Sequence, residues 1–197
     1  MIEKVQNGGT MFSIFNYCGS LAYNKKAHTE AGKMMNCMKP SEATPIVYGM
    51  NPQGGDRIWS IGATTEYPEL CMEVINYFCT PEGRLTMDYG PKGVCWDYDK
   101  EGNTYFTDLG KECNNNKQTK IGNGHKGTFQ DGTLQIVNTT WSVDASNPDS
   151  NGETYNSDNW KSNLSEASSD IEKDWRDKTG ATGVNDYMEK GKYVVAP

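Results

Sequence analysis

The sequence lacks the features that mark several common functional classes. It has no run of about 18 apolar residues, so it offers no membrane-crossing helix. Its six cysteines form no CxxC pair and its two histidines have no partners at ligand spacing, which argues against a structural zinc site. It also contains no nucleophile elbow, phosphate-binding loop or HExxH motif. We therefore expect neither a membrane span, a zinc domain nor a familiar catalytic motif.

Basic charge is also scarce. The 197 residues include 26 Asp and Glu against 19 Lys and Arg, a formal net charge of −7, and the basic residues are scattered. Without a basic stripe to neutralise phosphates, nucleic acid is not an expected partner. Eleven tyrosines and five tryptophans accompany only five phenylalanines. This balance favours aromatic rings with one wet edge, as on surfaces that meet polar ligands, although half-buried core positions would explain any single ring.

The cysteines permit disulfides without fixing them. They are Cys18, Cys37, Cys71, Cys79, Cys95 and Cys113. Six thiols allow many different pairings, so the sequence leaves the connectivity open.

A short apolar and aromatic run over 11–17 predicts a buried strand. Ligands of open α/β sheets often bind beyond such strand ends. Asn16 and Tyr17 are therefore candidate binding residues. Asn24 is then expected to cap a helix that continues to about Met38.

A second strand is predicted over 57–63, and it contains two further candidates. Trp59 fits either a core position or a platform for a sugar ring. Arg57 stands beside it as a polar candidate. Both interpretations of Trp59 remain open at this point.

Two consecutive helices follow. Pro68 fits a first helical position, and apolar residues then recur at helical spacing up to Phe78. Thr80 is placed to cap a second helix, with Pro81 as its first residue and Gly90 as its stop.

Residues 94–98 and 103–107 then predict a β-hairpin, because Gly102 can adopt positive φ in the turn between them. Trp96 and Tyr98 share one face of this hairpin by the alternation of side chains along a strand. That face would be either a stacking surface for a ligand or the hydrophobic side of a small sheet.

The later part of the chain changes character twice. Residues 114–158 are rich in Asn, Gly, Ser, Thr and Asp and predict mostly irregular surface structure. Helical spacing returns between Trp160 and Trp175, where Ser168 and Ser169 could divide the helix in two. A last short helix is predicted over 185–190.

Residues 147–158 fit the twelve-residue calcium-loop pattern. Oxygen-bearing side chains occupy its first, third and fifth positions, glycine the sixth and an acid the twelfth. The candidate metal ligands are Asn147, Asp149, Asn151, Glu153 and Asp158. An Asx-rich turn explains the same residues, because the first position is Asn and the last a short Asp. Calcium is the only cofactor that the sequence suggests.

Three motifs carry a family resemblance. The first is YPELCMEVINYFCTPEG at 67–83, and the second is DYGPKGVCW at 88–96. The third runs from NWKS at 159–162 to WRDKTG at 175–180. Together they resemble the family 1 extracellular solute-binding proteins, in particular the sugar-binding lipoproteins of Gram-positive bacteria. Lys92 departs from the pattern, since an acid is common there.

The resemblance implies an α/β lobe of the periplasmic-binding-protein-like type II fold. That lobe is expected over 1–113 with the hairpin at 93–107, followed by an irregular surface segment at 114–158 and a helical C-terminal part at 159–197. Family members carry a signal peptide, a lipid-anchored cysteine and a first lobe upstream. The chain is therefore expected to be a fragment of a longer extracellular, membrane-anchored lipoprotein.

The implied function is substrate capture for an ABC importer, without catalysis. Such a protein holds a carbohydrate or another small solute between two lobes and presents it to the membrane permease; we expect it to be monomeric. A sugar needs aromatic plates for its C–H faces and polar groups for its hydroxyls. The candidate ligand-binding residues are Asn16, Tyr17, Arg57, Trp59 and Trp96.

Two other classes remain as alternatives. A glycoside hydrolase would need two carboxylates about 5–10 Å apart across a cleft, and the sequence has many carboxylates. A surface adhesion module is favoured by the polar, Asn-rich middle region, and it predicts no deep pocket.

Overall fold

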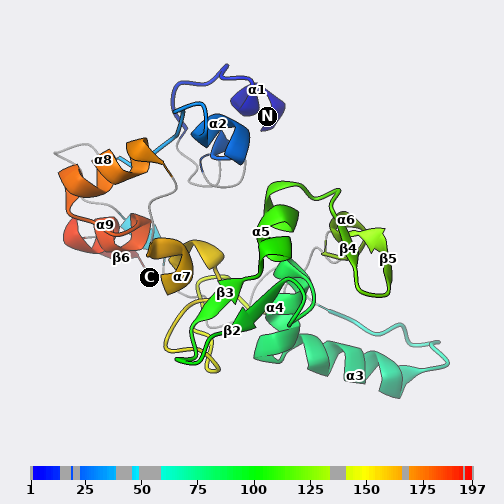
Figure 1. Cartoon of the computed structure of the whole chain (residues 1–197). Helices are drawn as coiled ribbons and strands as arrows, with labels where there is room; N and C mark the ends of the chain where they lie inside the picture. The colour runs from blue at the N-terminus through cyan, green and yellow to red at the C-terminus, as the bar shows by residue number, and fades with distance from the viewer. Residues whose placement is uncertain are drawn as a thin grey trace. The chain divides into compact units, whose positions relative to one another are not determined.

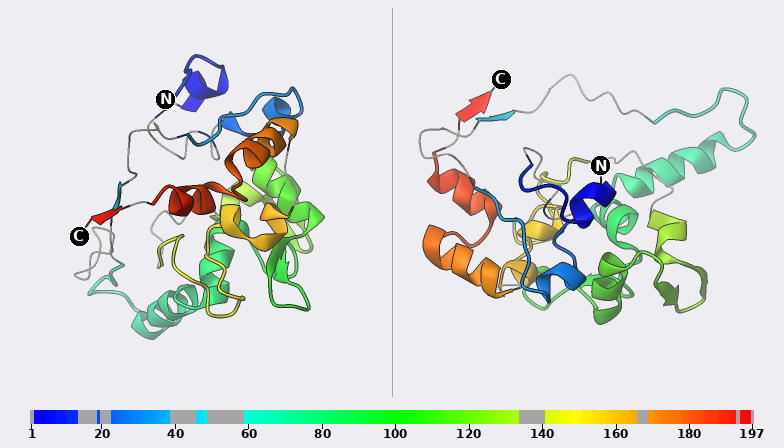
Figure 2. Two further views of the ribbon diagram at one scale, coloured as in Figure 1. Left: turned by 90° about the vertical axis from the view of Figure 1, so that its left-hand side faces the viewer. Right: turned by 90° about the horizontal axis from the view of Figure 1, so that it is seen from above.

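Over the residues that the structure describes, the fold is mixed α/β and mostly helical, with two small two-stranded antiparallel sheets and one short parallel strand pair (Figure 1, Figure 2). The computed structural model describes residues 2–13, 19, 23–38, 46–48, 59–133, 141–165, 169–192 and 194–196. Within these ranges, no helix has both the length and the apolar character that crossing a bilayer requires. The predicted α/β class is confirmed at this coarse level.

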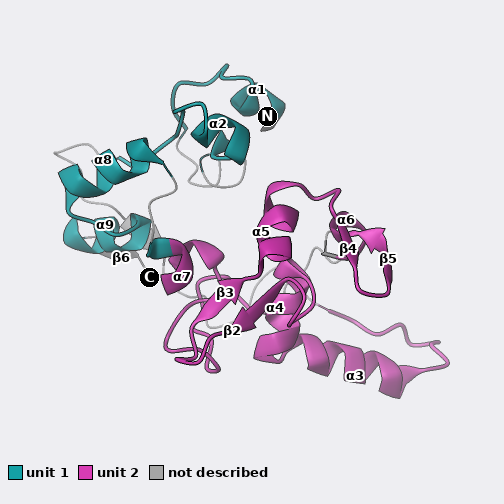
Figure 3. Cartoon of the chain, in the orientation of Figure 1, with its two compact units in different colours: residues 1–50, 164–197 teal, residues 51–163 magenta. Residues whose placement is uncertain are grey.

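Contacts divide the chain into two compact units (Figure 3). Unit 1 combines residues 1–50 with 164–197, and unit 2 comprises 51–163. The segment ends predicted at 113 and 158 both fall inside unit 2.

Contacts between distant parts of the sequence help to hold unit 1 together. Its elements are α1 (Ile2–Gln6), α2 (Lys26–Thr29), β1 (Ile46–Tyr48), α8 (Asp170–Thr179), α9 (Val184–Lys190) and β6 (Val194–Ala196). β1 and β6 pair in parallel. The indole N–H of Trp175 donates to the carbonyl of Cys37 at 2.8 Å, and its ring contacts Tyr187 edge-on. These contacts join α8 to α9 and to the N-terminal part of the chain.

The predicted helix over 24–38 is wrong in length and in its cap. α2 spans only Lys26–Thr29, and Gly32 beyond it adopts φ +67°. The Asn24 side chain instead bonds both backbone groups of Met35, donating to its carbonyl and accepting from its N–H, each at 2.8 Å. This bond folds the chain back on itself where the sequence pattern predicts a continuous helix.

The division of the late helical region is confirmed. α7 (Lys161–Leu164) and α8 are separate helices, and Ser169 caps α8 by accepting from the backbone N–H of Glu172. Gly180 ends α8 in the left-handed conformation, as its lack of a Cβ allows.

Unit 2 contains the elements that the sequence predicts best. They are α3 (Pro68–Phe78), α4 (Pro81–Tyr89), β2 (Trp96–Tyr98), β3 (Thr104–Phe106), α5 (Asp108–Asn115), β4 (Lys120–Gly122), β5 (His125–Thr128), α6 (Phe129–Thr133) and the 3-10 helix η2 (Ser157–Asn159), with all of α7 except Leu164 at its end. α3, α4 and the β2–β3 hairpin confirm the predictions.

The close contact between α3 and α4 requires a glycine at position 83, the last residue of the motif at 67–83. Thr80 caps α4 by accepting from the N–H of Gly83 at 3.1 Å. A Cβ added to Gly83 would come within 1.9 Å of the Tyr77 carbonyl oxygen. The two helices can therefore meet this closely only with glycine at this position.

The predicted strand at 57–63 is absent from its described part, where residues 59–62 have no regular structure and 63–64 form a turn. The segment predicted to be mostly irregular, 114–158, also contains the β4–β5 hairpin and α6, which the sequence pattern did not predict. Asn123 and Gly124 both adopt positive φ in that hairpin turn, which an Asn-Gly pair readily provides.

The core of unit 2 lies between α4, the β2–β3 hairpin and α5. Its fully or nearly buried members are Leu85, Cys95, Trp96, Phe106, Cys113, Phe129, Tyr155 and Trp160. Tyr89 packs against this cluster, with ring contacts to Phe106 and Trp160. Its hydroxyl donates to the carbonyl of Tyr155 and accepts from the N–H of Ser157, so it connects α4 to the segment at 155–157.

Alkaline pH is expected to destabilise unit 2 through Tyr89. Burial raises the pKa of Tyr89 to about 12, against 10.0 for the unperturbed phenol. Between pH 10 and 12 the unfolded chain loses this proton while the folded chain keeps it, so the free energy of unfolding falls by up to about 1.4 kcal/mol per pH unit. Urea unfolding across this pH range, compared with Tyr89→Phe, measures the difference. An equal pH dependence in both proteins would contradict the assignment.

Candidate functional site

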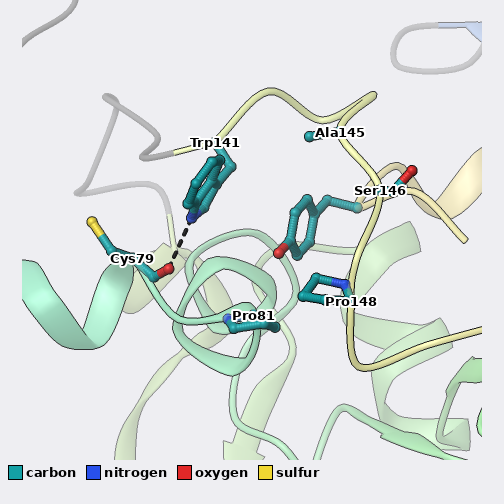
Figure 4. Close-up of a pocket in the computed structure, with 7 residues that line it drawn as sticks. Cys79, Pro81, Trp141, Ala145, Ser146 and Pro148 are labelled. Atoms are coloured by element: carbon teal, nitrogen blue, oxygen red, sulfur yellow. Dashed lines mark hydrogen bonds between the residues drawn. The ribbon is translucent and has the colours of Figure 1, made fainter. Parts of the chain in front are cut away.

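Unit 2 carries an open groove beside the start of α4 (Figure 4). Its lining is mostly apolar and comes from two parts of the chain: Cys79, Pro81, Trp141, Ala145, Ser146, Pro148 and Tyr155. Its volume is about 350 Å³. This is at the lower end of the range of roughly 300–1,000 Å³ for small-molecule sites.

Trp141 is fixed by both its side chain and its backbone. Its indole N–H donates to the carbonyl of Cys79 at 2.8 Å, as the dashed line in Figure 4 shows. Its own carbonyl accepts from Nε of Arg84 at 2.9 Å. The side chain is nevertheless 48% exposed. The groove therefore has one large aromatic ring that is anchored at its polar edge and still open to solvent.

Arg84 supports the groove from inside the protein. It is completely buried on α4, forms an ion pair with Asp88 at 2.6 Å, and places its guanidinium carbon 5.7 Å from the centre of the Tyr155 ring. Its Nη2 has no hydrogen-bond partner in the described part of the chain. Arg84 thus connects α4 to both aromatic residues that line the groove.

Tyr155 forms the buried wall of the groove. Its backbone N–H donates to the carbonyl of Ala145 at 3.1 Å, which brings together two segments that both line the groove. Burial raises the pKa of the Tyr155 phenol, the nearby Asp149 carboxylate raises it further, and the Arg84 cation opposes them. The phenol therefore stays protonated at neutral pH and presents a neutral hydroxyl.

Three of the sequence-predicted binding residues, Asn16, Tyr17 and Arg57, lie outside the described residues. Trp59 is described and is half-buried. Its ring centre is 5.8 Å from that of Phe78 on α3, and its buried indole nitrogen has no hydrogen-bond partner in the described ranges. The structure does not bring Trp59 into the groove lining.

Trp96 has a core role in the structure, which does not support its assignment as a ligand-binding residue. The side chain has no exposed surface, and its indole N–H donates to the carbonyl of Gly90 at 2.8 Å. Its ring meets Tyr98 edge-on at 5.5 Å. Of the two alternatives for this face of the hairpin, the hydrophobic side of a small sheet fits these contacts.

The side chains of the predicted calcium loop connect it to the rest of unit 2. Asn147 is buried; its Oδ1 accepts from the N–H of Asp149, which is an Asx turn, and its Nδ2 donates to the Tyr98 hydroxyl. The Asn151 amide donates to the carbonyl of Glu101 in the β2–β3 turn. Asp158 lies exposed in η2.

Glu153 is the most constrained of these residues. Its two carboxylate oxygens accept from the N–H of Thr104 at 2.7 Å and from the N–H of Lys161 at 2.8 Å. In the described ranges, no group of three or more His, Cys, Asp and Glu side chains is arranged to hold a metal ion. Calcium binding stays a prediction, and it would require Glu153 to share its oxygens with these two donors.

Trp141 and Tyr155 were not predicted as binding residues, although each is a large aromatic residue in a stretch otherwise rich in Asn, Ser and Asp. That isolation is the signal that could have found them. Comparison of the chain with protein-family models, curated proteins and solved structures gives no match. The chemistry of the groove therefore decides what it can do. It offers an aromatic plate, an apolar floor and hydroxyl groups, which suit reversible binding of a ligand with apolar faces.

Proposed function

We propose that the chain is part of the extracellular substrate-binding component of an ABC importer, with a carbohydrate as its solute. In this proposal the chain forms one lobe of a periplasmic-binding-protein-like type II fold, with a β-hairpin and C-terminal helices. The three sequence motifs support it, and the α3–α4 corner gives the most specific of them a physical reason. The glycine of TPEG is the residue whose absent side chain lets the two helices meet.

The observation that carries the proposal is the exposed, anchored ring of Trp141 at the edge of the groove. Sugar rings have apolar C–H faces that stack on aromatic plates and hydroxyls that need polar partners. Trp141 can provide the plate without reorganising, because the Cys79 carbonyl and Arg84 already hold its edge and its backbone. Ser146 adds a hydroxyl to the lining.

The composition of the groove favours binding over glycoside hydrolysis at this place. Hydrolysis needs two carboxylates on opposite sides of the sugar, and the described residues that line the groove include neither Asp nor Glu. Asn16, Tyr17, Arg57 and Trp59 stay predicted contributors to the binding cleft. Surface anchoring through a lipid and docking to a membrane permease are part of the same proposal.

A thermal-shift screen against mono- and oligosaccharides tests this function. A ligand that binds only the folded state raises the Tm by mass action, and about 100 times its Kd adds roughly 2.7 kcal/mol of stability. We expect one sugar class to raise the Tm of the full chain. We expect Trp141→Ala to lose that shift and Trp141→Phe, which keeps a ring but not the indole N–H, to retain part of it.

The control variant is Tyr105→Ala, which removes an exposed ring from β3 outside the groove lining. It should bind sugars like the wild type. Running the screen with calcium and with a chelator also tests the 147–158 loop, because a calcium site must raise the Tm on its own. A well-folded chain whose Tm responds to no sugar would contradict the carbohydrate proposal, and release of shortened sugars would point to the hydrolase alternative.

A further inference from the structure

Two cysteines of unit 2 lie side by side in its core. Cys95 precedes β2 and Cys113 lies on α5, and neither has any exposed surface. Both belong to the same hydrophobic cluster, and each thiol influences the pKa of the other. Both are free thiols in the structure. Residues 18 positions apart are therefore held close by the fold.

Backbone packing explains why they meet. A Cβ added to Gly110 on α5 would lie 1.7 Å from the carbonyl oxygen of Cys95 and 3.2 Å from its Cα. The helix therefore touches the Cys95 backbone directly. Cys113 follows Gly110 by three residues, which places it on the same face of α5. Thr107, the N-cap of α5, also donates its backbone N–H to the Cys95 carbonyl at 3.0 Å.

The Cys95 sulfur is enclosed on its other side as well. A Cβ added to Gly90 would come within 2.8 Å of this sulfur and 3.0 Å of the Phe129 ring. Burial raises the pKa of the Cys95 thiol to about 12, and the neighbouring Cys113 adds to the effect. In the folded protein this thiol is therefore neither accessible nor ionised.

We propose that Cys95 and Cys113 form a disulfide bond that joins the start of the β2–β3 hairpin to α5. Two S–H bonds break and one S–S bond forms. The two electrons and two protons pass to a small-molecule disulfide such as oxidised glutathione, which is cleaved to two thiols. The exchange proceeds through a mixed disulfide during folding, before the core closes over the two sulfurs.

The structure also argues against a disulfide between Cys71 and Cys79. Cys71 lies on α3 and Cys79 ends it, so eight residues of helix part them by about 12 Å, beyond the reach of a disulfide. Structural disulfides persist in oxidising compartments, so this bond would agree with an extracellular location. The inference does not depend on sugar binding, since it rests only on the packing of unit 2.

Peptide mapping tests the bond directly, because trypsin places Cys95 and Cys113 in two different peptides. Cys95 lies in the tryptic peptide 93–100 (GVCWDYDK) and Cys113 in 112–117 (ECNNNK), each with a single cysteine. The full chain is refolded in a mixture of reduced and oxidised glutathione, alkylated while denatured, and digested without reduction. We expect one cross-linked species of these two peptides, about 2 Da lighter than their sum, because two hydrogens are lost. Recovery of both peptides in alkylated form, or chiefly linked to other cysteines, would overturn the proposal.

Thermal unfolding gives a second measurement. Each protein is compared with itself, with and without reductant, so the variants need not be equally stable. Reducing the refolded wild type should lower its Tm by about 5–10 °C, because the bond no longer restricts the unfolded chain. The Tm of Cys95→Ala/Cys113→Ala should be insensitive to the reductant, whatever its starting value. Cys71→Ala should respond like the wild type. A wild-type Tm that is unchanged by reduction would count against the bond.

Discussion

Gly110→Ala is expected to destabilise unit 2 by about 3 kcal/mol or more, at the upper end of the cost of overpacking. The added Cβ would meet the carbonyl oxygen of Cys95 at 1.7 Å and its carbonyl carbon at 2.7 Å. Both partners are backbone atoms, so no side-chain rotation can relieve the clash. α5 would have to move away from the hairpin, opening the core around Cys113.

Urea unfolding followed by tryptophan fluorescence measures this loss, since Trp96 and Trp160 are fully buried in the affected core. Gly132→Ala provides the matched control. Gly132 lies in the short helix α6, and a Cβ there meets nothing within 4 Å. That variant should be neutral or more stable by up to about 1 kcal/mol, because alanine favours helix. Equal midpoints for Gly110→Ala and the wild type would show that α5 does not pack as described.

Replacing Glu153 is expected to produce the other large effect. Its buried carboxylate accepts from the backbone N–H groups of Thr104 and Lys161, at 2.7 and 2.8 Å. Glu153→Ala leaves both donors without their acceptor, at a cost of about 1–3 kcal/mol each. Glu153→Gln keeps one acceptor oxygen but turns an amide NH2 toward the other donor. We expect a loss of about 3 kcal/mol or more for Ala and a smaller loss for Gln.

Chemical unfolding of both variants, beside Glu101→Gln at an exposed position in the β2–β3 turn, measures this contribution. The control removes the same charge but leaves no buried N–H group without an acceptor. It should therefore change the free energy of unfolding little. If Glu153→Ala were as stable as the control, the carboxylate would not hold the hairpin to α7. A stability loss that appears only when calcium is present would instead favour a metal role for Glu153.

Local signals account for the elements that the sequence predicts correctly. Pro68 begins α3, Thr80 caps α4 and Gly90 ends it, and each signal acts within a few residues. The β2–β3 hairpin likewise depends on Gly102, whose φ is +83°. Such elements can be predicted because the groups that determine them are neighbours in the sequence.

Elements that depend on distant contacts could not be predicted in the same way. The helix predicted from Asn24 fails because the Asn24 amide pairs with the backbone of Met35, 11 residues on. The β4–β5 hairpin has a clear Asn-Gly turn at 123–124, but its strands lack the alternating β-branched and aromatic residues that usually mark strands.

The groove depends on contacts of still longer range. Trp141 bonds the carbonyl of Cys79, 62 residues away, and its carbonyl accepts from Arg84, 57 residues away. No spacing rule connects residues at such separations. The sequence could therefore suggest aromatic residues as candidates for binding, but it could not show which of the five tryptophans lines the groove.

Isothermal titration calorimetry on the wild-type chain and on Trp141→Ala is the most direct test of the proposed function. The titrant is the oligosaccharide that gives the largest thermal shift. We expect saturable binding to the wild type and an affinity at least about tenfold weaker for the variant, the loss expected when a central aromatic contact is removed. Equal affinities in both proteins, or no binding to the folded wild-type chain, would contradict the assignment of this groove as a sugar-binding site.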